Sequence, residues 1–329
     1  MKKIIAIALA VLLAMSLIAC STTPPADDGP KQLVVGYAQL GHESDWRVGC
    51  TESVKSAVAA AGWKLEFVDA DQKEEEQIKT LRDFITMGVD YIAFSPVVES
   101  GWDEVMKEIK EAGIPVVMLD RNIDMPNRED YFEAWIGADF IAEGEKAAKW
   151  LIDYMEAEGR GDDEINIVEL QGTVGSSPAN DRMKGFKDGI AGKANFQITQ
   201  TQTGNFETDL GKTVMESFLK SGERIDVLFA HNDNMALGAI QAIEEAGLVP
   251  GVDIIIIGVD AIKLAFEAII DGKMNCTVEC TPLLGPKLVE TIQKLEAGDS
   301  VPKTLNPDEY VYDEYFYKNV ISELPNRVY

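Results

Sequence analysis

The sequence predicts an α/β fold made of two doubly wound parallel-sheet lobes, and three observations carry this prediction. About 300 residues follow a short N-terminal leader, which is enough for two lobes with buried cores. Ten short apolar runs alternate with stretches that have helical spacing, a pattern typical of parallel sheets covered on both faces. A polar stretch without periodicity, Asp120 to Tyr131, divides the pattern in two.

The leader, residues 1–19, has the features of a secretory signal peptide. Lys2 and Lys3 precede an apolar run from Ile4 to Ile18, and this run is too short to span a bilayer comfortably. The order Leu17-Ile18-Ala19-Cys20 resembles the bacterial lipobox, which predicts lipidation of Cys20. An ordinary signal peptide followed by an incidental cysteine is the alternative.

Residues 20–30 are polar, rich in proline and without periodicity, and we expect them to form a flexible tether. Beyond the tether, the predicted strands begin at Leu33, Lys64, Tyr91, Pro115, Ala134, Ile165, Phe196, Val227, Ile254 and Cys276. The clearest helical spacing covers Glu74 to Thr86, Asp103 to Glu111, Ala142 to Tyr154 and Met235 to Glu245. Glycines follow several of these helices, as expected at helix ends.

The charge balance argues against a nucleic-acid partner. The chain has 30 basic and 56 acidic residues and a formal net charge of −26, so it repels polyanions at long range. Apart from Cys20, the cysteines are Cys50, Cys276 and Cys280, and we expect them to be buried free thiols. Their spacing and the two histidines do not suggest a metal site, and no dinucleotide fingerprint indicates a cofactor.

In parallel α/β sheets, ligands bind beyond the carboxyl ends of the strands, so the residues at those ends are the candidate site. These are Glu43, Trp46, Arg47, Asp120, Arg121, Asp139, Arg182, Phe206, Asn232, Asp260 and Glu279. Arginine forks and carboxylates suit a neutral ligand with many hydroxyl groups, and the two aromatic rings suit the C–H face of a sugar. Carboxylates would oppose a phosphorylated ligand.

Each candidate also has a purely structural interpretation. Asp120, Asn232 and Asp260 are suitable helix caps. Arg47 and Arg182 could be solvated helix residues, Trp46 a core residue, and Glu43 a solvated loop carboxylate.

Several of these residues stand in motifs that resemble the type 1 periplasmic binding proteins of sugar ABC importers, the ribose- and galactose-binding group. The motifs are Leu119-Asp120-Arg121, Gly185-Phe186 after Arg182, Ala230 to Ala239, and Ile257-Gly258-Val259-Asp260. Within that family, Gly41 to Arg47, Ser95 to Trp102 and Val168 to Gly175 resemble the galactofuranose-binding members. The ribose-type pattern has two phenylalanines where Trp46 and Arg47 stand, which argues against ribose.

The resemblance implies two lobes joined by a three-segment hinge, with a monosaccharide bound between them by closure. The implied lobes are residues 31–138 plus 281–308 and residues 139–280 plus 309–329. Trp46 would stack on the sugar ring and the polar candidates would bind its hydroxyls. The implied partners are an ABC permease and its ATPase, with a monomeric protein that touches the membrane only through its lipid.

Three other functions were weighed against this one. A sugar-responsive repressor shares the fold, but the signal peptide and the acidic charge oppose it. An enzyme on a doubly wound fold would need a cofactor motif or a catalytic pair, and none is evident in the sequence. A sugar sensor that delivers its closed form to a chemoreceptor or sensor kinase stays open.

Overall fold

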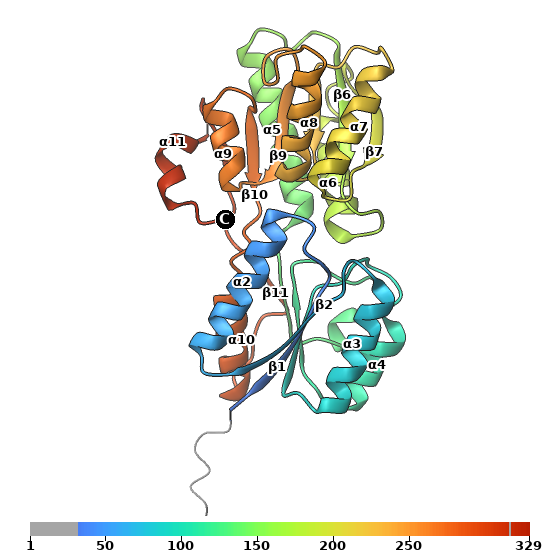
Figure 1. The fold of residues 1–329 in the computed structure, drawn as a ribbon, viewed down its shortest axis with the longest axis vertical. Helices are drawn as coiled ribbons and strands as arrows, with labels where there is room; N and C mark the ends of the chain where they lie inside the picture. The colour runs from blue at the N-terminus through green and yellow to red at the C-terminus, as the bar shows by residue number, and fades with distance from the viewer. Residues whose placement is uncertain (1–31, 316) are drawn as a thin grey trace, which may run out of the picture. The chain divides into compact units, whose positions relative to one another are not determined.

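The computed structural model describes residues 32–315 and 317–329, which form two lobes (Figure 1). The predicted signal peptide at 1–19, the predicted lipidation site Cys20 and the predicted tether at 20–30 lie outside the described residues. Within the described part of the chain, no helix combines the length and the apolar character that crossing a bilayer requires.

The first lobe is built on a six-stranded parallel sheet with the order β11-β5-β4-β3-β1-β2. Its strands are β1 (Val34–Gln39), β2 (Lys64–Asp69), β3 (Tyr91–Phe94), β4 (Val116–Leu119), β5 (Ala134–Ile136) and β11 (Thr304–Leu305). Its helices are α2 (Asp45–Ala60), α3 (Glu74–Met87), α4 (Asp103–Glu111) and α10 (Gly285–Glu296). Helices α2 and α10 pack on one face of the sheet, and α3 and α4 pack on the other (Figure 1).

The second lobe is built on a seven-stranded sheet with the order β13-β12-β10-β9-β8-β6-β7, in which only β10 and β12 pair antiparallel. Its strands are β6 (Ile165–Gln171), β7 (Phe196–Thr203), β8 (Val227–Ala230), β9 (Ile255–Asp260), β10 (Cys276–Glu279), β12 (Val311–Asp313) and β13 (Lys318–Asn319). Its helices are α5 (Phe140–Ala157), α6 (Ser177–Ile190), α7 (Thr208–Lys220), α8 (Asp233–Glu245), α9 (Lys263–Ile270) and α11 (Val320–Glu323). Short 3-10 helices cover Arg128–Asp130 and Leu324–Asn326.

Burial along the strands explains the apolar pattern of the sequence. The central strands β3, β4, β8 and β9 are buried at every position, because helices cover both faces of each sheet. The edge strand β7 has only one covered face, and its sequence FQITQTQT accordingly alternates. The glycines that follow helices, Gly62, Gly88, Gly113 and Gly247, all have left-handed φ angles.

The two sheets share one topology, which confirms the predicted fold class. The order β2-β1-β3-β4-β5 in the first lobe corresponds to β7-β6-β8-β9-β10 in the second. In such doubly wound sheets the strand order reverses between the first and third strands, and a crevice opens there at the carboxyl ends. The segments after β1 and β6 therefore enter the candidate site.

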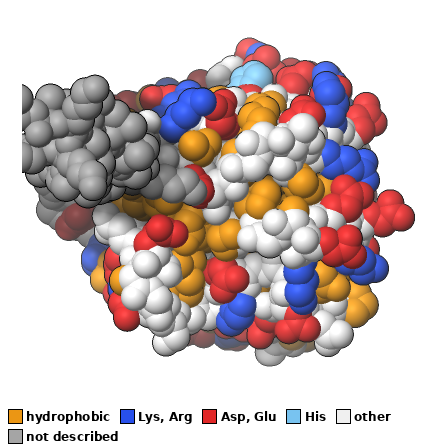
Figure 2. Space-filling model, turned by 90° about the horizontal axis from the view of Figure 1, so that it is seen from below, with side chains coloured by type: hydrophobic (Ala, Val, Ile, Leu, Met, Phe, Trp, Pro, Cys, Tyr) orange, Lys and Arg blue, Asp and Glu red, His pale blue; other side chains and the backbone are white. Residues whose placement is uncertain are grey.

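The chain passes between the sheets after β5, after β10 and after β11. The predicted lobe boundaries, 31–138 plus 281–308 and 139–280 plus 309–329, have their junctions in these passages and stay predictions. On the face in Figure 2, acidic side chains stand among basic and polar ones and do not form one patch.

Candidate ligand-binding site

A small cavity lies where the carboxyl ends of the two sheets face each other. It is lined by Glu43, Ser44, Trp46, Arg47, Asp120 and Arg121 from the first lobe, and by Pro178, Arg182, Phe206, Asn232, Asp260 and Cys280 from the second. Its volume is about 20 Å³, which is room for about one water molecule. The structure thus brings together all but two of the predicted site residues.

Arg47 is clamped between two carboxylates. It lies in the first turn of α2 and is buried, so it is not a solvated helix residue. Its Nη2 donates to Asp120 Oδ2 at 2.7 Å and its Nε donates to Glu43 Oε1 at 3.1 Å. Burial opposes the charge, but Asp120 and Glu43 outweigh burial and raise the pKa of Arg47 above its ordinary value. The guanidinium is therefore a fixed, charged group at the cavity wall.

Trp46 lines the cavity and also contacts the segment after β10, where the chain passes between the lobes for the second time. Its ring lies under the guanidinium of Arg47, with 4.7 Å from Cζ to the ring centre. Its Nε1 donates to the carbonyl oxygen of Cys280 at 2.6 Å. Trp46 is buried, as a core residue would be, and it also lines the cavity.

Arg121 is held by the backbone and by aromatic contact. Its Nη1 donates to Val97 O at 2.6 Å, and its Cζ lies 5.2 Å from the centre of the Phe206 ring. Its Nη2 is 3.6 Å from Glu43 Oε1. Burial, and then the nearby charge of Arg47, lower the pKa of Arg121 to about 10. Arg121 still carries its charge at neutral pH.

Arg182 is the basic residue through which the second lobe contributes a positive charge to the cavity lining. It lies on α6, is buried, and its Nη1 donates to His231 O at 2.5 Å. Its Nε donates to Glu143 Oε2 at 2.7 Å. Its Nη2 is 3.8 Å from Asp260 Oδ1, near the end of β9.

Asp260 is a buried carboxyl group beside Arg182. Burial is the main cause that raises the pKa of Asp260 well above its usual value; Arg182 opposes this shift, and Asp233 adds to it. A carboxyl group accepts hydrogen bonds in either protonation state, which suits a ligand hydroxyl group.

Among the three suggested helix caps, only Asn232 caps a helix. Its Oδ1 accepts from Met235 N at 3.0 Å at the start of α8, while its Nδ2 donates to Phe206 O at 3.1 Å. Asp120 instead binds Arg47, and α9 is preceded by Ile262 rather than by Asp260.

Backbone strain gathers around the cavity. Among the eight described non-glycine residues with a left-handed φ angle, three line the cavity: Asp120 (57°), Phe206 (68°) and Asp260 (118°). Asn205 and Ala261 are their chain neighbours, and the other three lie elsewhere. Each such residue costs roughly 1–3 kcal/mol and persists only where its surroundings fix it. The fold therefore holds these side chains at the strand ends against a local preference.

Some polar atoms at the cavity are buried and have no hydrogen-bond partner among the described residues: Glu43 Oε2, Arg47 Nη1 and Arg121 Nε. Leaving such a group unpaired costs about 1–3 kcal/mol, and more when it is charged. One acceptor and two donors of residues that line the cavity from the first lobe are therefore left without a partner. A small ligand with several hydroxyl groups can serve all three.

Two predicted site residues do not reach the cavity. Asp139 caps α5, where its Oδ1 accepts from Ala142 N at 3.0 Å. Glu279 turns the other way, and its Oε1 accepts from Arg327 Nη1 at 2.8 Å. Neighbouring side chains of a strand point to opposite sides, so when Glu279 faces the C-terminal tail, Cys280 faces the cavity.

The predicted site lacks three lining residues, Ser44, Pro178 and Cys280, and it also lacks Glu143, which supports Arg182 from outside the cavity lining. Counting one residue past the end of β10 would have found Cys280. The helical spacing of α5 does not distinguish Glu143 from the other polar residues of that helix. Its relevance to the site follows only from its ion pair with Arg182. As predicted, Cys50, Cys276 and Cys280 are buried free thiols.

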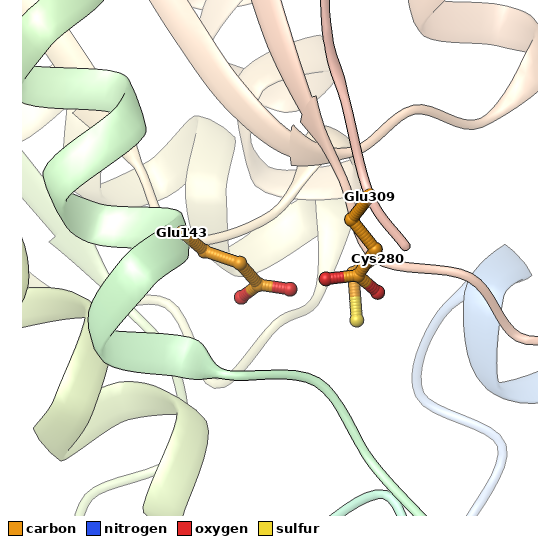
Figure 3. A group of neighbouring side chains, drawn as sticks. All are labelled: Glu143, Cys280 and Glu309. Atoms are coloured by element: carbon orange, nitrogen blue, oxygen red, sulfur yellow. The ribbon is translucent and has the colours of Figure 1, made fainter. Parts of the chain in front are cut away.

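Glu143 also belongs to a group of three side chains, with Cys280 and Glu309, whose donor atoms lie within 4.8 Å of one another (Figure 3). Within the described residues this group is the candidate for holding a metal ion. Arg182 already neutralises Glu143 at 2.7 Å, which disfavours a second cation there.

Comparison with known proteins identifies the family. The sequence matches the model of the periplasmic binding protein domain over residues 35–299. The chain belongs to this family. This periplasmic binding protein is 43% identical over 276 residues to the galactofuranose-binding protein YtfQ of Escherichia coli (strain K12), covering 83% of this chain and 85% of the relative.

Two solved structures are similar to this periplasmic binding protein throughout both lobes. A Mycobacterium smegmatis protein in complex with β-D-fucofuranose has a TM-score of 0.85 and 48% identity, covering 89% of this chain and 94% of that one. The binding protein of the arabinose ABC transporter from Shewanella sp. ANA-3, bound to α- and β-L-arabinofuranose, has a TM-score of 0.83 and 43% identity, covering 89% and 95%. This chain is a binding protein rather than an enzyme, as predicted.

Proposed function

We propose that this protein is the extracytoplasmic substrate-binding lipoprotein of an ABC sugar importer. It captures a neutral monosaccharide in the furanose ring form, galactofuranose or a close analogue, between its two lobes. The observation that carries the proposal is the cavity between the lobes: Glu43, Arg47 and Arg121 line it from the first lobe, each with a buried polar atom unpaired among the described residues, and Arg182 and Asp260 line it from the second.

The charges at the cavity favour a neutral ligand. Three arginines face the cavity, but Arg47 is paired with Asp120 and Glu43, and Arg182 is paired with Glu143. A phosphate group would compete with these carboxylates for the same guanidinium groups. Trp46 and Phe206 add the apolar surface that the C–H face of a sugar ring needs.

The ring form is inferred from the relatives and from Arg47. Galactofuranose, fucofuranose and arabinofuranose, which the three relatives bind, are all five-membered rings. Arg47 Nη1 is a buried donor without a partner among the described residues. This donor is available for an extra polar contact with the ligand, in agreement with the resemblance to the galactofuranose-binding members.

Hinge closure is the proposed mechanism. A cavity of about 20 Å³ holds about one water molecule, so the lobes must part for a monosaccharide to enter, and in the sugar-bound state they must stand wider apart than in the described structure. Ligand contacts from both lobes then stabilise the closed state by the difference in affinity between the two states. We propose that an ABC permease and its ATPase use this closed form, while the lipid on Cys20 keeps the protein at the membrane.

A thermal-shift and calorimetric screen of the soluble fragment 31–329 tests the ligand class. We expect binding with Kd near micromolar or below, about −8 kcal/mol or better. A sugar at 100 times its Kd raises the free energy of unfolding by about 2.7 kcal/mol. Galactose labelled with ¹³C at C1 is then added to the protein. The NMR signals of its anomeric carbon in the bound state report the ring form. Enrichment of the pyranose signals would overturn the ring assignment, and a shift with amino acids or nucleotides but no sugar would overturn the proposal.

Replacement of Arg121 tests the site itself. Arg121→Ala removes a charged donor that the geometry directs at the ligand, and we expect sugar affinity to fall by about 10- to 100-fold, because hydrogen bonds to charged groups contribute about 1.5–3 kcal/mol. Arg82→Ala is a matched control, since Arg82 pairs with Glu108 on the surface of the same lobe. Unchanged affinity in Arg121→Ala would remove this residue from the site.

A further inference from the structure

The group of Glu143, Cys280 and Glu309 lies where the chain passes between the lobes. Glu143 is in the first turn of α5, just after the first passage, Cys280 begins the second passage and Glu309 lies in the third (Figure 3). Glu143 and Cys280 are fully buried or nearly so, with 0% and 2% exposed surface. Figure 3 shows the Glu143 carboxylate pointing toward the other two side chains.

The two oxygens of Glu143 have different environments. Oε2 accepts from Arg182 Nε at 2.7 Å, while Oε1 is buried and has no hydrogen-bond partner among the described residues. A buried carboxylate oxygen needs a donor. Two side chains with donor atoms lie within 4.8 Å of Glu143: Cys280, whose hydrogen bond lowers the pKa of Glu143 against the effect of burial, and Glu309, the second carboxyl group.

Glu309 is able to serve as that donor. Its Oε1 accepts from Thr281 N at 3.0 Å, which leaves its other oxygen free to carry a proton. Burial, and then the charge of Glu143, raise the pKa of Glu309 to about 9, although Lys146 and Arg182 act in the opposite direction. At neutral pH Glu309 therefore keeps its proton.

The other titratable groups around the pair leave this assignment intact. Lys146 of α5 directs its ammonium group to the backbone oxygen of Glu309 at 3.1 Å, and Arg182 of α6 is committed to Glu143 and His231 O. Burial raises the pKa of Cys280 well above its usual value, so the thiol stays neutral. Asp260 of β9 faces Arg182 on the side of the cavity.

We infer that Glu143 and Glu309 form a hydrogen-bonded carboxylate–carboxyl pair that positions Arg182 in the binding cavity. The proton of Glu309 is donated to Oε1 of Glu143, and Glu143 Oε2 then fixes the guanidinium of Arg182. The pair also connects α5 to the segment between β11 and β12, where the chain passes between the lobes for the third time. It therefore links the predicted hinge to the cavity. This role of Arg182 rests on the proposed sugar-binding function, whereas the shared proton does not.

The pH dependence of sugar affinity tests the positioning role. Above pH 9 Glu309 loses its proton, two like charges then lie within 4.8 Å, and Arg182 loses its support. We expect affinity to fall about tenfold between pH 7 and pH 10, and Glu309→Gln, which keeps a donor but cannot ionise, to flatten this profile. Glu309→Ala should bind more weakly than Glu309→Gln at pH 7. The exposed neighbour Asp308 provides the control Asp308→Asn, which should keep the wild-type profile.

The pH dependence of thermal unfolding, measured without sugar, tests the shared proton separately. Between pH 5 and pH 9 the unfolded chain releases the proton of Glu309 while the folded chain retains it, so wild-type stability falls as pH rises through this window. Glu309→Gln removes this loss. The difference between the Tm of Glu309→Gln and the Tm of the wild type should therefore increase from pH 5 to about pH 9 and then stay constant.

The two measurements separate the possible failures. A Tm difference that does not change with pH would overturn the shared proton, whether or not any sugar binds. A Tm difference that grows with pH, together with a sugar-affinity profile that Glu309→Gln leaves unchanged, would overturn the positioning of Arg182. If no sugar binds at all, the proposed function fails and the Tm result still decides the pair.

Discussion

At the scale of single residues, the cavity depends on close contacts between backbone and ring. Gly172 follows β6, and a Cβ atom on it would lie 1.9 Å from Cζ of Phe206. Phe206 is itself held at a φ of 68° and stacks near Arg121. Glycine at 172 therefore decides where the ring lies, because the strained backbone of Phe206 leaves it little freedom to retreat.

Gly172→Ala should displace this ring and weaken both stability and binding. Overpacking of this kind costs about 1–3 kcal/mol, and we expect sugar affinity to fall at least tenfold as Phe206 leaves the cavity. Calorimetry and thermal unfolding measure the two effects. Gly192→Ala is the control, since no atom lies within 4 Å of a Cβ added there. Equal behaviour of the two variants would show that Phe206 is not held by Gly172.

The residues of the site could be predicted only as far as strand ends define them. Asp120 follows β4 directly, Asn232 lies two residues beyond β8, and Asp260 is the last residue of β9, so the rule for parallel sheets finds them. The rule does not specify to which side of the sheet a side chain points. It therefore selects Glu279, although Cys280 is the residue that lines the cavity. Glu143 acts through Arg182, and that pairing depends on tertiary packing that no local pattern encodes.

At the scale of elements, helices of the two lobes meet directly across the cleft. Asp45 in the first turn of α2 and Asn234 in the first turn of α8 form a reciprocal pair: Asp45 N donates to Asn234 Oδ1 at 3.2 Å, and Asn234 Nδ2 donates to Asp45 Oδ2 at 2.8 Å. Asn180 Nδ2 likewise donates to Glu99 Oε2 at 2.6 Å. None of these residues lines the cavity, so these bonds stabilise closure without contacting a ligand.

Asp45→Ala should therefore weaken the binding of every sugar by a similar factor. The loss of one such hydrogen bond costs about 0.5–1.5 kcal/mol, or about 2- to 12-fold in affinity. Isothermal titration with two or more sugars measures the factor for each. Glu104→Ala removes an exposed acidic residue from the first turn of α4 in the same lobe and should have no effect. A loss confined to one sugar would mean that Asp45 acts on the ligand and not on closure.

Elements long enough to show a period could be predicted, and the shortest could not. All ten predicted strands form, because buried strands of a parallel sheet are continuous apolar runs. The strands β11, β12 and β13 have two or three residues each, too few to show an alternation. They form because the passages after β10 and β11 bring the chain beside β5 and β10, which are long-range contacts.

At the scale of the whole molecule, the proposed function depends on an equilibrium between closed and open arrangements of the lobes. The described structure is closed: hydrogen bonds cross the cleft, and the cavity is too small to admit a sugar. Opening must separate Trp46 of the first lobe from Cys280 O, to which its Nε1 now donates at 2.6 Å. It should therefore expose Cys280, which has 2% of its surface accessible in the closed form.

Alkylation of individual cysteines measures this opening. In the absence of sugar we expect iodoacetamide to modify Cys280 slowly, because its raised pKa leaves little thiolate even after exposure. A saturating sugar should slow the reaction by the factor through which it shifts the lobes toward closure. Cys276 lies within β10 and Cys50 within α2, both with 0% exposed surface, and each should stay unmodified in either state. Mass spectrometry resolves the three sites in one sample. If sugar left the Cys280 rate unchanged while binding was demonstrated, the lobes would not open around this cavity, and ligand entry would have to follow local side-chain motion instead.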